Sequence, residues 1–169
     1  MTHCSECGHR LEIRDATRRF CSNCQQIRYR NPAVGVAVLV VQATEVLLAR
    51  RARGLYAGRW CVPCGYVEWD EDVRSAALRE LREETGLDAQ LGPVFDVQSN
   101  FHDPERHSVG IWFLAHAWHG QVTPGDDVNE VRFFPLDALP ELAFATDGIV
   151  LSKLAAFLSS KTADRATSR

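Results

Sequence analysis

The sequence lacks the two features that would place the chain in or across a membrane. Its longest apolar run, Ala33 to Val41, is far too short to span a bilayer, which needs about 20 apolar residues. We also expect no secretion leader, because Met1 is followed at once by polar residues and Cys4 instead of a charged and then an apolar segment. Internal repeats and low-complexity tracts are absent as well. We therefore expect a cytoplasmic protein with no membrane partner.

Length and composition suit one catalytic-size domain with a small appendage. The chain has 169 residues, of which 46% are hydrophobic and 24% charged. We expect a module over residues 1–31, a main domain over residues 32–160 and a disordered tail over residues 161–169. The net charge of -3 disfavours a protein that binds nucleic acid over its whole surface. Residues 1–31 nevertheless have an excess of arginines over acidic residues, so any affinity for a polyanion is expected there.

Hydrophobic patterning predicts an α/β domain after the boundary at Asn31-Pro32. Apolar runs that are β-branched or alternate with polar residues predict strands. These runs are Val34 to Val41, Val46 to Leu48, Val94 to Val97, Val109 to Trp118 and Val131 to Phe134. A helical pattern from Asp70 to Thr85 ends at Gly86. Further short helices are predicted at Leu136 to Leu139 and at Ile149 to Leu158.

The six cysteines are poor candidates for disulfide bonds in a chain without a secretion signal, because reducing compartments keep thiols free. Four of them form two CxxC pairs, namely Cys4, Cys7, Cys21 and Cys24. Two such pairs can set four thiolates tetrahedrally, so the spacing predicts structural Zn²⁺ in a small zinc ribbon. Cys61 and Cys64 form a third pair that no further pair faces, and we expect them to be buried loop residues.

The predicted helix from Asp70 carries three carboxylates on one face. At 100° per residue, Glu80, Glu83 and Glu84 fall within roughly a third of its circumference. Like charges at this spacing cost a helix about a few tenths of a kcal/mol each, which suggests that a cation compensates. Clustered hard oxygen ligands suit Mg²⁺ or Mn²⁺ with phosphate. The alternative interpretation of the helix alone is a solvated acidic face balanced by arginines such as Arg79.

The segment around this helix resembles the Nudix box. That motif is a glycine, five residues, a glutamate, seven residues and then Arg-Glu-apolar-any-Glu-Glu-any-Gly-apolar. Every position is matched here, by Gly65, Glu71, Arg79, Glu80, Leu81, Glu83, Glu84, Gly86 and Leu87. One departure lies just before the box, where Cys64 replaces the more usual first glycine of a pair. That replacement is tolerable if the position needs no positive φ.

The resemblance implies a Nudix pyrophosphohydrolase that has an α/β/α sandwich with a mixed sheet and uses a divalent metal ion. By position, Glu80, Glu83 and Glu84 would be the metal ligands, with Glu83 or Glu84 deprotonating the attacking water. Glu71 and Arg79 would pair to brace the loop against the helix. The family often adds one more acid from a distant loop, and the candidates here are Asp126, Asp127 and Glu130. Among these we favour Glu130.

Recognition of the substrate's base would come from aromatic and apolar walls of a pocket. The candidates are Trp60, Tyr66, Phe101 and Trp112. Packing in a hydrophobic core is the alternative, and more common, role of such residues.

A zinc ribbon joined to a Nudix domain is similar to the arrangement in the NADH pyrophosphatase branch. That branch carries a SQPWPFPxS signature after the box, where this sequence has VQSNFHDPERHSVG. The expected substrate is therefore ADP-ribose or a related dinucleotide such as NADH or FAD. Homodimers are frequent in the family, and a homodimer is one expectation here. The basic ribbon would favour nucleic acid as a further partner, including the removal of nucleotide caps from RNA.

A rival hypothesis is a non-catalytic nucleotide-sensing module whose ribbon binds nucleic acid or a protein partner. Loss of box glutamates would be its mark in the sequence. All of these glutamates are present, so the sequence favours the enzyme.

Overall fold

The chain divides into two compact units, Met1–Pro32 and Ala33–Arg169, and the computed structural model describes residues 2–104 and 106–167. The first unit is an antiparallel sheet of β1 (Glu12–Ile13), β2 (Arg18–Phe20) and β3 (Ile27–Tyr29), in that order. In its core, Leu11 packs with the buried Cys4 and Cys21. Three buried side chains give so small a module little hydrophobic stabilisation.

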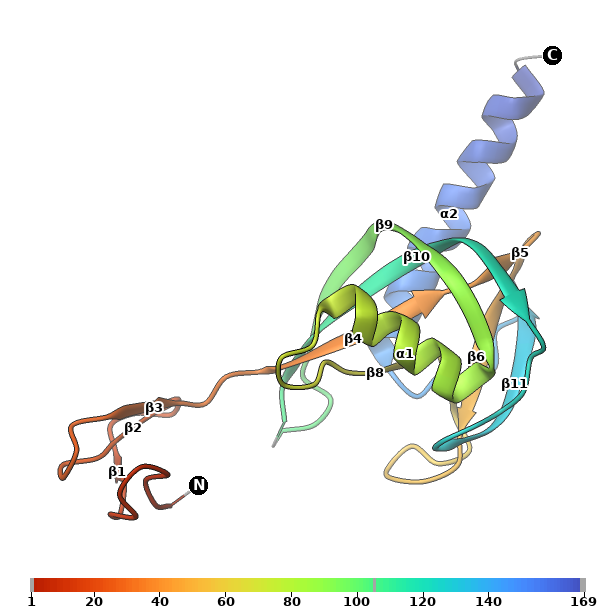
Figure 1. Ribbon diagram of the computed structural model, residues 1–169. Coiled ribbons are helices and arrows are strands. Elements are labelled where there is room, and N and C mark those ends of the chain that lie inside the picture. Colours follow the sequence, from red (N-terminus) through yellow and green to blue (C-terminus); the bar gives the residue numbers. More distant parts are fainter. Residues whose placement is uncertain (1, 105, 168–169) are drawn as a thin grey trace. The chain divides into compact units, whose positions relative to one another are not determined.

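Two sheets form the centre of the second unit (Figure 1). The first has the order β8-β4-β10-β9, with β8 at Cys64–Tyr66, β4 at Ala33–Leu39, β10 at Ser108–Gly120 and β9 at Leu87–Asn100. The second has the order β11-β6-β5, with β11 at Val128–Pro135, β6 at Glu45–Arg51 and β5 at Val41–Gln42, and β7 (Trp60–Cys61) also pairs with β6. Strands β4 and β10 run parallel and the pairs β4–β8 and β10–β9 run antiparallel, so the first sheet is mixed.

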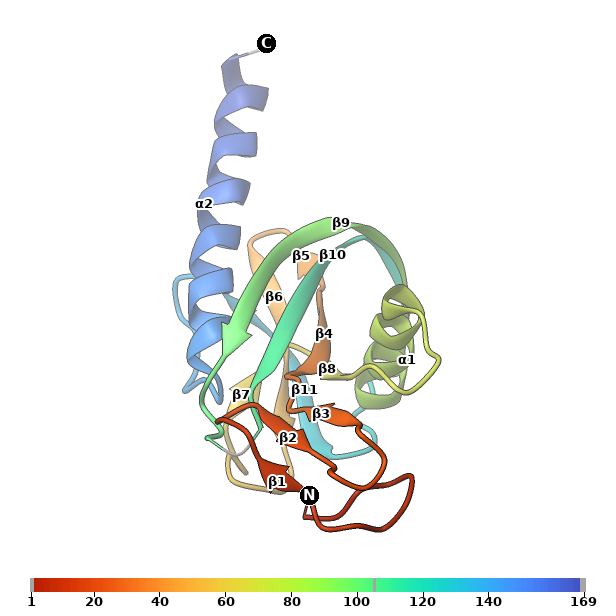
Figure 2. The ribbon, with the colours of Figure 1, turned by 90° about the vertical axis from the view of Figure 1, so that its left-hand side faces the viewer.

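The two helices, α1 (Val73–Thr85) and α2 (Ala145–Thr167), lie on opposite sides of the sheets (Figure 2). Strand β4 contributes side chains to the hydrophobic cores on both sides of its sheet, because successive side chains of a strand point to opposite faces. Val36 and Val38 pack in one core with Leu81 of α1. Leu39 packs in the other core with Leu154 of α2. The α/β/α sandwich expected from the sequence is confirmed.

Several local predictions differ from the structure. Leu136 to Leu139 forms a turn instead of a short helix, because Pro135 and Pro140 bracket it. Helix α2 extends beyond both ends of the predicted segment Ile149 to Leu158. It continues into residues 161–169, for which the sequence predicts disorder; residues 168–169 lie outside the described residues. Cys61 and Cys64 lie at the ends of strands β7 and β8 instead of in a loop.

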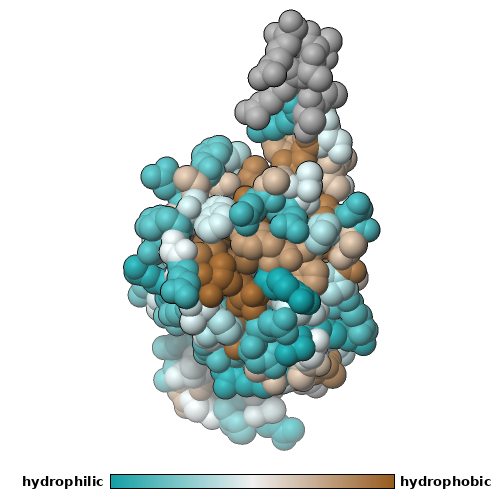
Figure 3. Space-filling model, turned by 90° about the vertical axis from the view of Figure 1, so that its right-hand side faces the viewer, coloured by the Kyte–Doolittle hydropathy of each residue, from teal (hydrophilic) through white to brown (hydrophobic). Residues whose placement is uncertain are grey.

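Hydrophilic residues cover most of the face shown in Figure 3, with a patch of hydrophobic residues exposed near its middle. This distribution agrees with the burial of many aliphatic side chains in the two cores, since some apolar surface remains exposed in any folded protein. Among the described residues, no helix combines the length and the apolar composition that crossing a bilayer requires.

Candidate active site

Helix α1 begins and ends at residues suited to those positions. Asp72 is its N-cap, and Oδ1 of Asp72 accepts hydrogen bonds from the N–H groups of Arg74 and Ser75 at 2.9 and 3.3 Å. Gly86 ends the helix in the left-handed conformation, with φ 71°, and its N–H donates to the carbonyl of Arg82. The helix is fixed against the sheet by its buried side chains Ala76, Ala77 and Leu81. Its carboxylates therefore project from a rigid element.

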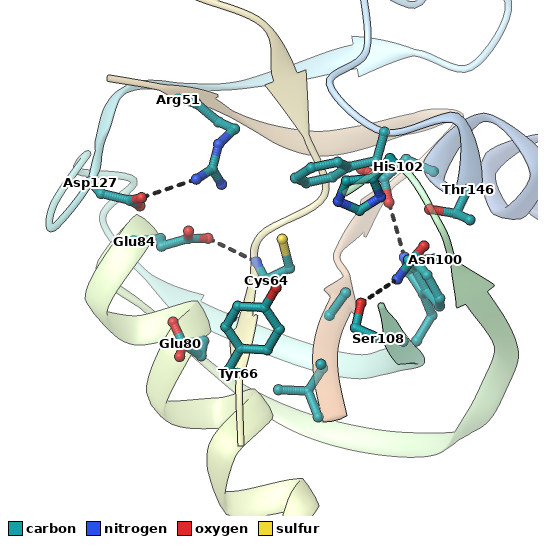
Figure 4. A pocket seen from close by; sticks show the side chains of 18 of the residues that line it. Arg51, Cys64, Tyr66, Glu80, Glu84, Asn100, His102, Ser108, Asp127 and Thr146 are labelled. Carbon is teal, nitrogen blue, oxygen red and sulfur yellow. Dashed lines mark hydrogen bonds and ion pairs between the residues drawn. The ribbon is translucent and has the colours of Figure 1, made fainter. Parts of the chain in front are cut away.

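Side chains from α1, the strands and several loops enclose a cavity of about 380 Å³ (Figure 4). Acidic residues line it from several elements: Glu80 and Glu84 from α1, Asp126 and Asp127 from the loop before β11, Glu68 from the box loop and Asp147 from α2. Gly35 of β4 and Gly110 of β10 also line the cavity, where the absence of side chains leaves space over the sheet. The cavity is large enough for part of a nucleotide.

Glu84 is buried, with 1% of its surface exposed, although it is acidic. Its Oε2 accepts a hydrogen bond of 2.9 Å from the N–H of Cys64, the residue just before the box glycine Gly65. Burial raises the pKa of Glu84 to about 8, and the charges of Asp127 and Glu80 add to this effect. Burial also raises the pKa of Glu80, against the opposing effect of Arg79. Among the described residues, the cavity lining has several carboxyl groups and one arginine, Arg51, and hard oxygen ligands of this kind fit a divalent cation.

Arg79 connects the box loop to the helix. Its Nε and Nη2 donate to the two oxygens of Glu71 at 2.8 and 2.9 Å, which is bidentate geometry. Its Nη2 also donates to the carbonyl of Tyr66, and its Nη1 donates to both Glu80 and Glu83. The Arg79 guanidinium lowers the pKa of Glu71 to about 2. Glu83 itself is 46% exposed and does not line the cavity.

The acidic loop before β11 is tied to the end of α1. The N–H of Thr123 donates to the carbonyl of Thr85 at 2.9 Å, and the N–H of Gly125 donates to the carbonyl of Glu84 at 3.1 Å. These bonds bring Asp126 and Asp127 to the cavity. Glu130, the acid favoured from the sequence, does not line the cavity.

Glu130 points away from the cavity because of the register of β11. It lies opposite Arg50 of β6, after an irregularity in the pairing that follows Val128. Its Oε2 forms an ion pair of 3.1 Å with Arg50. Glu130 is therefore paired at the surface. Asp127 forms an ion pair of 3.3 Å with Arg51, and both of these residues line the cavity.

The four aromatic candidates separate into two pairs. Tyr66 and Trp112 line the cavity. Trp60 is buried in the core on the α2 side, with its ring 4.6 Å from that of Phe134. Phe101 is 68% exposed and does not line the cavity. Trp60 is thus a core residue, which is the alternative role that its size suggested.

Two aromatic residues that line the cavity, His102 and Phe144, were missed as base-binding candidates. Each comes from a loop outside the box, one between β9 and β10 and the other before α2. An isolated ring in a loop gives no periodic signal in the sequence. Only the fold shows that the two rings meet.

The four N-terminal cysteines converge. The Sγ atoms of Cys4 and Cys24 are 3.6 Å apart and those of Cys7 and Cys21 are 3.5 Å apart, and all four lie within 4.8 Å of one another. A tetrahedron with metal–sulfur bonds of about 2.3 Å has sulfur–sulfur edges of about 3.8 Å. Backbone N–H groups of Glu6 and Cys7 lower the pKa of Cys4 to about 6, which favours the thiolate of this one ligand, whereas burial raises the pKa of Cys24 to about 12. The cluster can hold one metal ion.

A comparison with protein-family models matches residues 30–154 to the NUDIX domain. The match covers most of the chain and includes the whole box and the acidic loop. The chain belongs to the Nudix family. It is accordingly an enzyme, a Nudix pyrophosphohydrolase, and hydrolases of this family use a divalent metal ion. The resemblance expected from the box is confirmed.

Relatives of this Nudix hydrolase include an ADP-ribose pyrophosphatase of Methanocaldococcus jannaschii. It is 36% identical over 123 residues, which are 72% of this chain and 73% of that protein. An NAD-capped RNA hydrolase, NudC, of Pseudomonas aeruginosa is 33% identical over 141 residues, or 82% of this chain. The match spans only 49% of that longer protein.

Solved structures of Nudix hydrolases share the fold. A NUDIX hydrolase from Nitrosomonas europaea has a TM-score of 0.77 and 27% identity, and the match covers 96% of this chain and 93% of that one. A MutT NUDIX hydrolase from Burkholderia pseudomallei has a TM-score of 0.68 and 30% identity, and covers 73% of this chain and 98% of that one. The fold of the Nudix hydrolase described here is therefore that of its family.

Proposed function

We propose that the protein hydrolyses the pyrophosphate linkage of a nucleoside diphosphate linked to another moiety, with ADP-ribose as the preferred substrate. Water would add to one phosphorus and the P–O–P bridge would break, giving AMP and ribose 5-phosphate. The main support is the cavity in which carboxylates of α1 and of the acidic loop face aromatic rings. The ADP-ribose pyrophosphatase relative, which this chain matches over most of its length, supports the choice of substrate.

Glu80, Glu83 and Glu84 would hold Mg²⁺ or Mn²⁺. Glu80 and Glu84 line the cavity, and Glu83 binds the same Nη1 of Arg79 as Glu80 does. Such an ion, when bound, supplies charge neutralisation for phosphate oxygens and lowers the pKa of a water molecule. Glu83 or Glu84 would accept the proton from the water. Asp127 takes the place of Glu130 in this proposal, because Asp127 lines the cavity.

Arg51 would bind a phosphate of the substrate. Among the described residues that line the cavity, it is the one arginine, and no lysine lines it. Its guanidinium pairs with Asp127 and lies 5.6 Å from the ring centre of Phe144. A guanidinium suits phosphate because its planar N–H groups match pairs of phosphate oxygens.

Residues 1–31 would form a zinc ribbon and residues 32–160 the catalytic domain. Zn²⁺ is favoured over Mg²⁺ in the ribbon because four sulfur ligands in tetrahedral geometry suit it. The ribbon would stabilise the module and would take no part in the chemistry.

A panel of substrates tests the proposed function. The full chain is freed of metal with EDTA and then given Mg²⁺ or Mn²⁺. It is incubated with ADP-ribose, NADH, FAD, dinucleoside polyphosphates and nucleoside triphosphates. The products are separated chromatographically. We expect AMP and ribose 5-phosphate from ADP-ribose at the highest kcat/KM, and no turnover in EDTA. If the metal-loaded protein leaves every anhydride in the panel intact, the proposal is wrong.

Removal of a nucleotide cap from RNA is the second candidate function. The arginine-rich residues 1–31 and the similarity to the NudC relative favour it. A short RNA that carries a 5′-NAD cap, added to the panel, distinguishes the two. A kcat/KM above that for ADP-ribose, falling steeply with salt concentration, would make RNA the preferred substrate.

A further inference from the structure

Three aromatic rings from separate segments meet at the cavity. The imidazole of His102 and the ring of Phe144 are in contact in a tilted arrangement, with centroids 4.8 Å apart and planes inclined at 32°. Tyr56 contacts both edge-on, at 5.8 Å from His102 and 5.4 Å from Phe144. The edge-on geometry of the two Tyr56 contacts is one that aromatic pairs prefer. His102 and Phe144 line the cavity, whereas Tyr56 supports them from outside it.

The ring of His102 lies apart from the carboxylates of α1 and of the acidic loop. Figure 4 shows Glu80, Glu84 and Asp127 at one end of the cavity and His102 near the other, beside Asn100 and Ser108. A nucleoside diphosphate has the same polarity, with charged phosphates at one end of the nucleoside and a flat base at the other. The arrangement of the cavity therefore matches the arrangement of the proposed substrate.

The loop that carries His102 is anchored at both ends. Asn100 and Ser108 are paired across β9 and β10, and Nδ2 of Asn100 donates to Oγ of Ser108 at 3.3 Å. The ring of His102 is exposed and that of Phe144 is half-buried, so both have surface that a ligand can contact. A ring held in place in this way loses little conformational freedom when a base stacks on it.

We propose that His102 and Phe144 form the surface on which the aromatic base of the substrate stacks, and that Tyr56 is the positioning residue that holds both rings. This inference rests on the proposed function, whose substrates all carry a base. Stacking tolerates many bases, because every base has a flat face. The two rings would therefore select for the presence of an aromatic base, and other groups would select its identity.

Kinetics on two substrates test the proposal. The full chain and its variants are assayed with ADP-ribose and with a diphosphate that carries ribose at both ends and no base. His102→Ala and Phe144→Leu should each raise the KM for ADP-ribose by roughly tenfold or more, with kcat within about a factor of three. For the base-free substrate, KM should stay within about a factor of two. His102→Phe and Phe144→Tyr keep a flat ring and should restore most of the affinity.

Phe101→Ala is the matched control, because Phe101 is the neighbouring aromatic residue and does not line the cavity. It should leave the KM for both substrates unchanged. Tyr56→Leu should raise the KM for ADP-ribose without lowering kcat, and Tyr56→Phe should not, because the edge-on ring is retained. Equal losses on the two substrates, or a loss in Phe101→Ala as large as that in His102→Ala, would overturn the proposal.

Binding of AMP, measured by calorimetry, separates this inference from the proposed function. If the wild-type protein binds AMP and His102→Ala weakens binding roughly tenfold, the stacking surface is supported even when ADP-ribose is not hydrolysed. If ADP-ribose is hydrolysed and His102→Ala binds AMP as well as the wild type does, the proposed function stands and the stacking surface is wrong. Failure of the wild type to bind AMP also overturns the stacking surface.

Discussion

At the residue scale, two buried acids distinguish this protein from an ordinary α/β domain. Glu84 and Asp147 are each exposed by no more than 2%, and each accepts a backbone N–H, from Cys64 and from Val62 respectively. A buried carboxylate is costly unless it is hydrogen-bonded or neutralised. The box predicted a role for Glu84. Nothing in the sequence around Asp147 predicted its burial, because its partners are distant in the chain.

The first prediction concerns Glu84→Gln. The amide keeps an oxygen that can accept the N–H of Cys64 but loses the charge that a metal ligand or a base needs. We expect kcat for ADP-ribose to fall on the order of 100-fold or more. Circular dichroism and zinc content should match the wild type. Asp88→Asn, which removes a carboxylate paired with Arg82 outside the cavity, is the control and should keep kcat. Near-normal turnover in Glu84→Gln would rule out both roles.

The second prediction concerns Asp147, which lines the cavity and also accepts a bond of 3.2 Å from Nε1 of Trp112. Burial raises its pKa from the ordinary value of 3.8 to about 7. Between these two values the folded state binds a proton that the unfolded state releases. The contribution of Asp147 to the free energy of unfolding is therefore fully present below pH 4 and is lost as the pH rises to about 7.

Asp147→Asn removes this titration. The free energy of unfolding of the variant, minus that of the wild type, should therefore rise as the pH increases from about 4 to about 7. Urea unfolding of both proteins at intervals across this range measures the difference, and groups common to both cancel. A difference that stays constant with pH would show that Asp147 does not titrate in this window.

At the scale of elements, the site depends on how the acidic loop docks on α1. Gly125 lies against the last turn of the helix, and a Cβ at this position would overlap the backbone carbonyl oxygen of Glu83. A backbone oxygen cannot move aside without disturbing the helix end that carries Glu83 and Glu84. Gly125 is thus required by close approach, and it sets the position of Asp126 and Asp127.

The third prediction is that Gly125→Ala displaces the acidic loop and lowers kcat roughly 10- to 100-fold, while most of the fold is retained. Steady-state kinetics and circular dichroism measure the two effects. Gly148→Ala is the matched control, because the nearest atom to its added Cβ is Cδ1 of Leu142 at 3.8 Å. Since Gly148 is in a helix, this variant should gain about 0.5–1 kcal/mol in stability and keep its kcat. Wild-type kcat in Gly125→Ala would mean that the loop position is unimportant.

The elements were predicted unequally well. Helix α1 was close to the prediction because its cap at Asp72, its apolar face and Gly86 are all local signals. Strand β9 runs from Leu87 to Asn100, although only Val94 to Val97 read as a strand. Its other residues are held by pairing with β10, which lies further along the chain. Patterns within a short window do not contain that information.

At the scale of the whole molecule, the two units have different sources of stability. The unit Ala33–Arg169 has two hydrophobic cores, whereas Met1–Pro32 has one small cluster around two of its cysteines. We therefore expect the first unit to need a bound metal ion for folding. The second unit should keep its hydrolase activity when that ion is absent from the first.

The fourth prediction follows. Cys4→Ser should lower bound zinc well below one ion per chain and should destabilise the first unit, while the kcat of the remaining folded protein stays within about a factor of three. Zinc is measured by atomic absorption and kcat with ADP-ribose. His9→Ala changes another polar residue of this unit outside the thiol cluster and should keep its zinc. Stoichiometric zinc in Cys4→Ser would contradict the assignment of the ribbon.

The sequence by itself determined the family, the helix that carries the glutamates, and the four thiols. Each of these is encoded by residues a few positions apart, so fixed spacings on a helix or in a CxxC pair suffice. The tertiary structure decided which distant residues complete the cavity. The pairing of β11 with β6 turned Glu130 toward Arg50 and left Asp127 at the cavity. Trp60 packs in the core, and His102 and Phe144 join Tyr66 and Trp112 in the aromatic wall of the cavity. Contacts between distant segments depend on strand register and loop path, which no short pattern specifies.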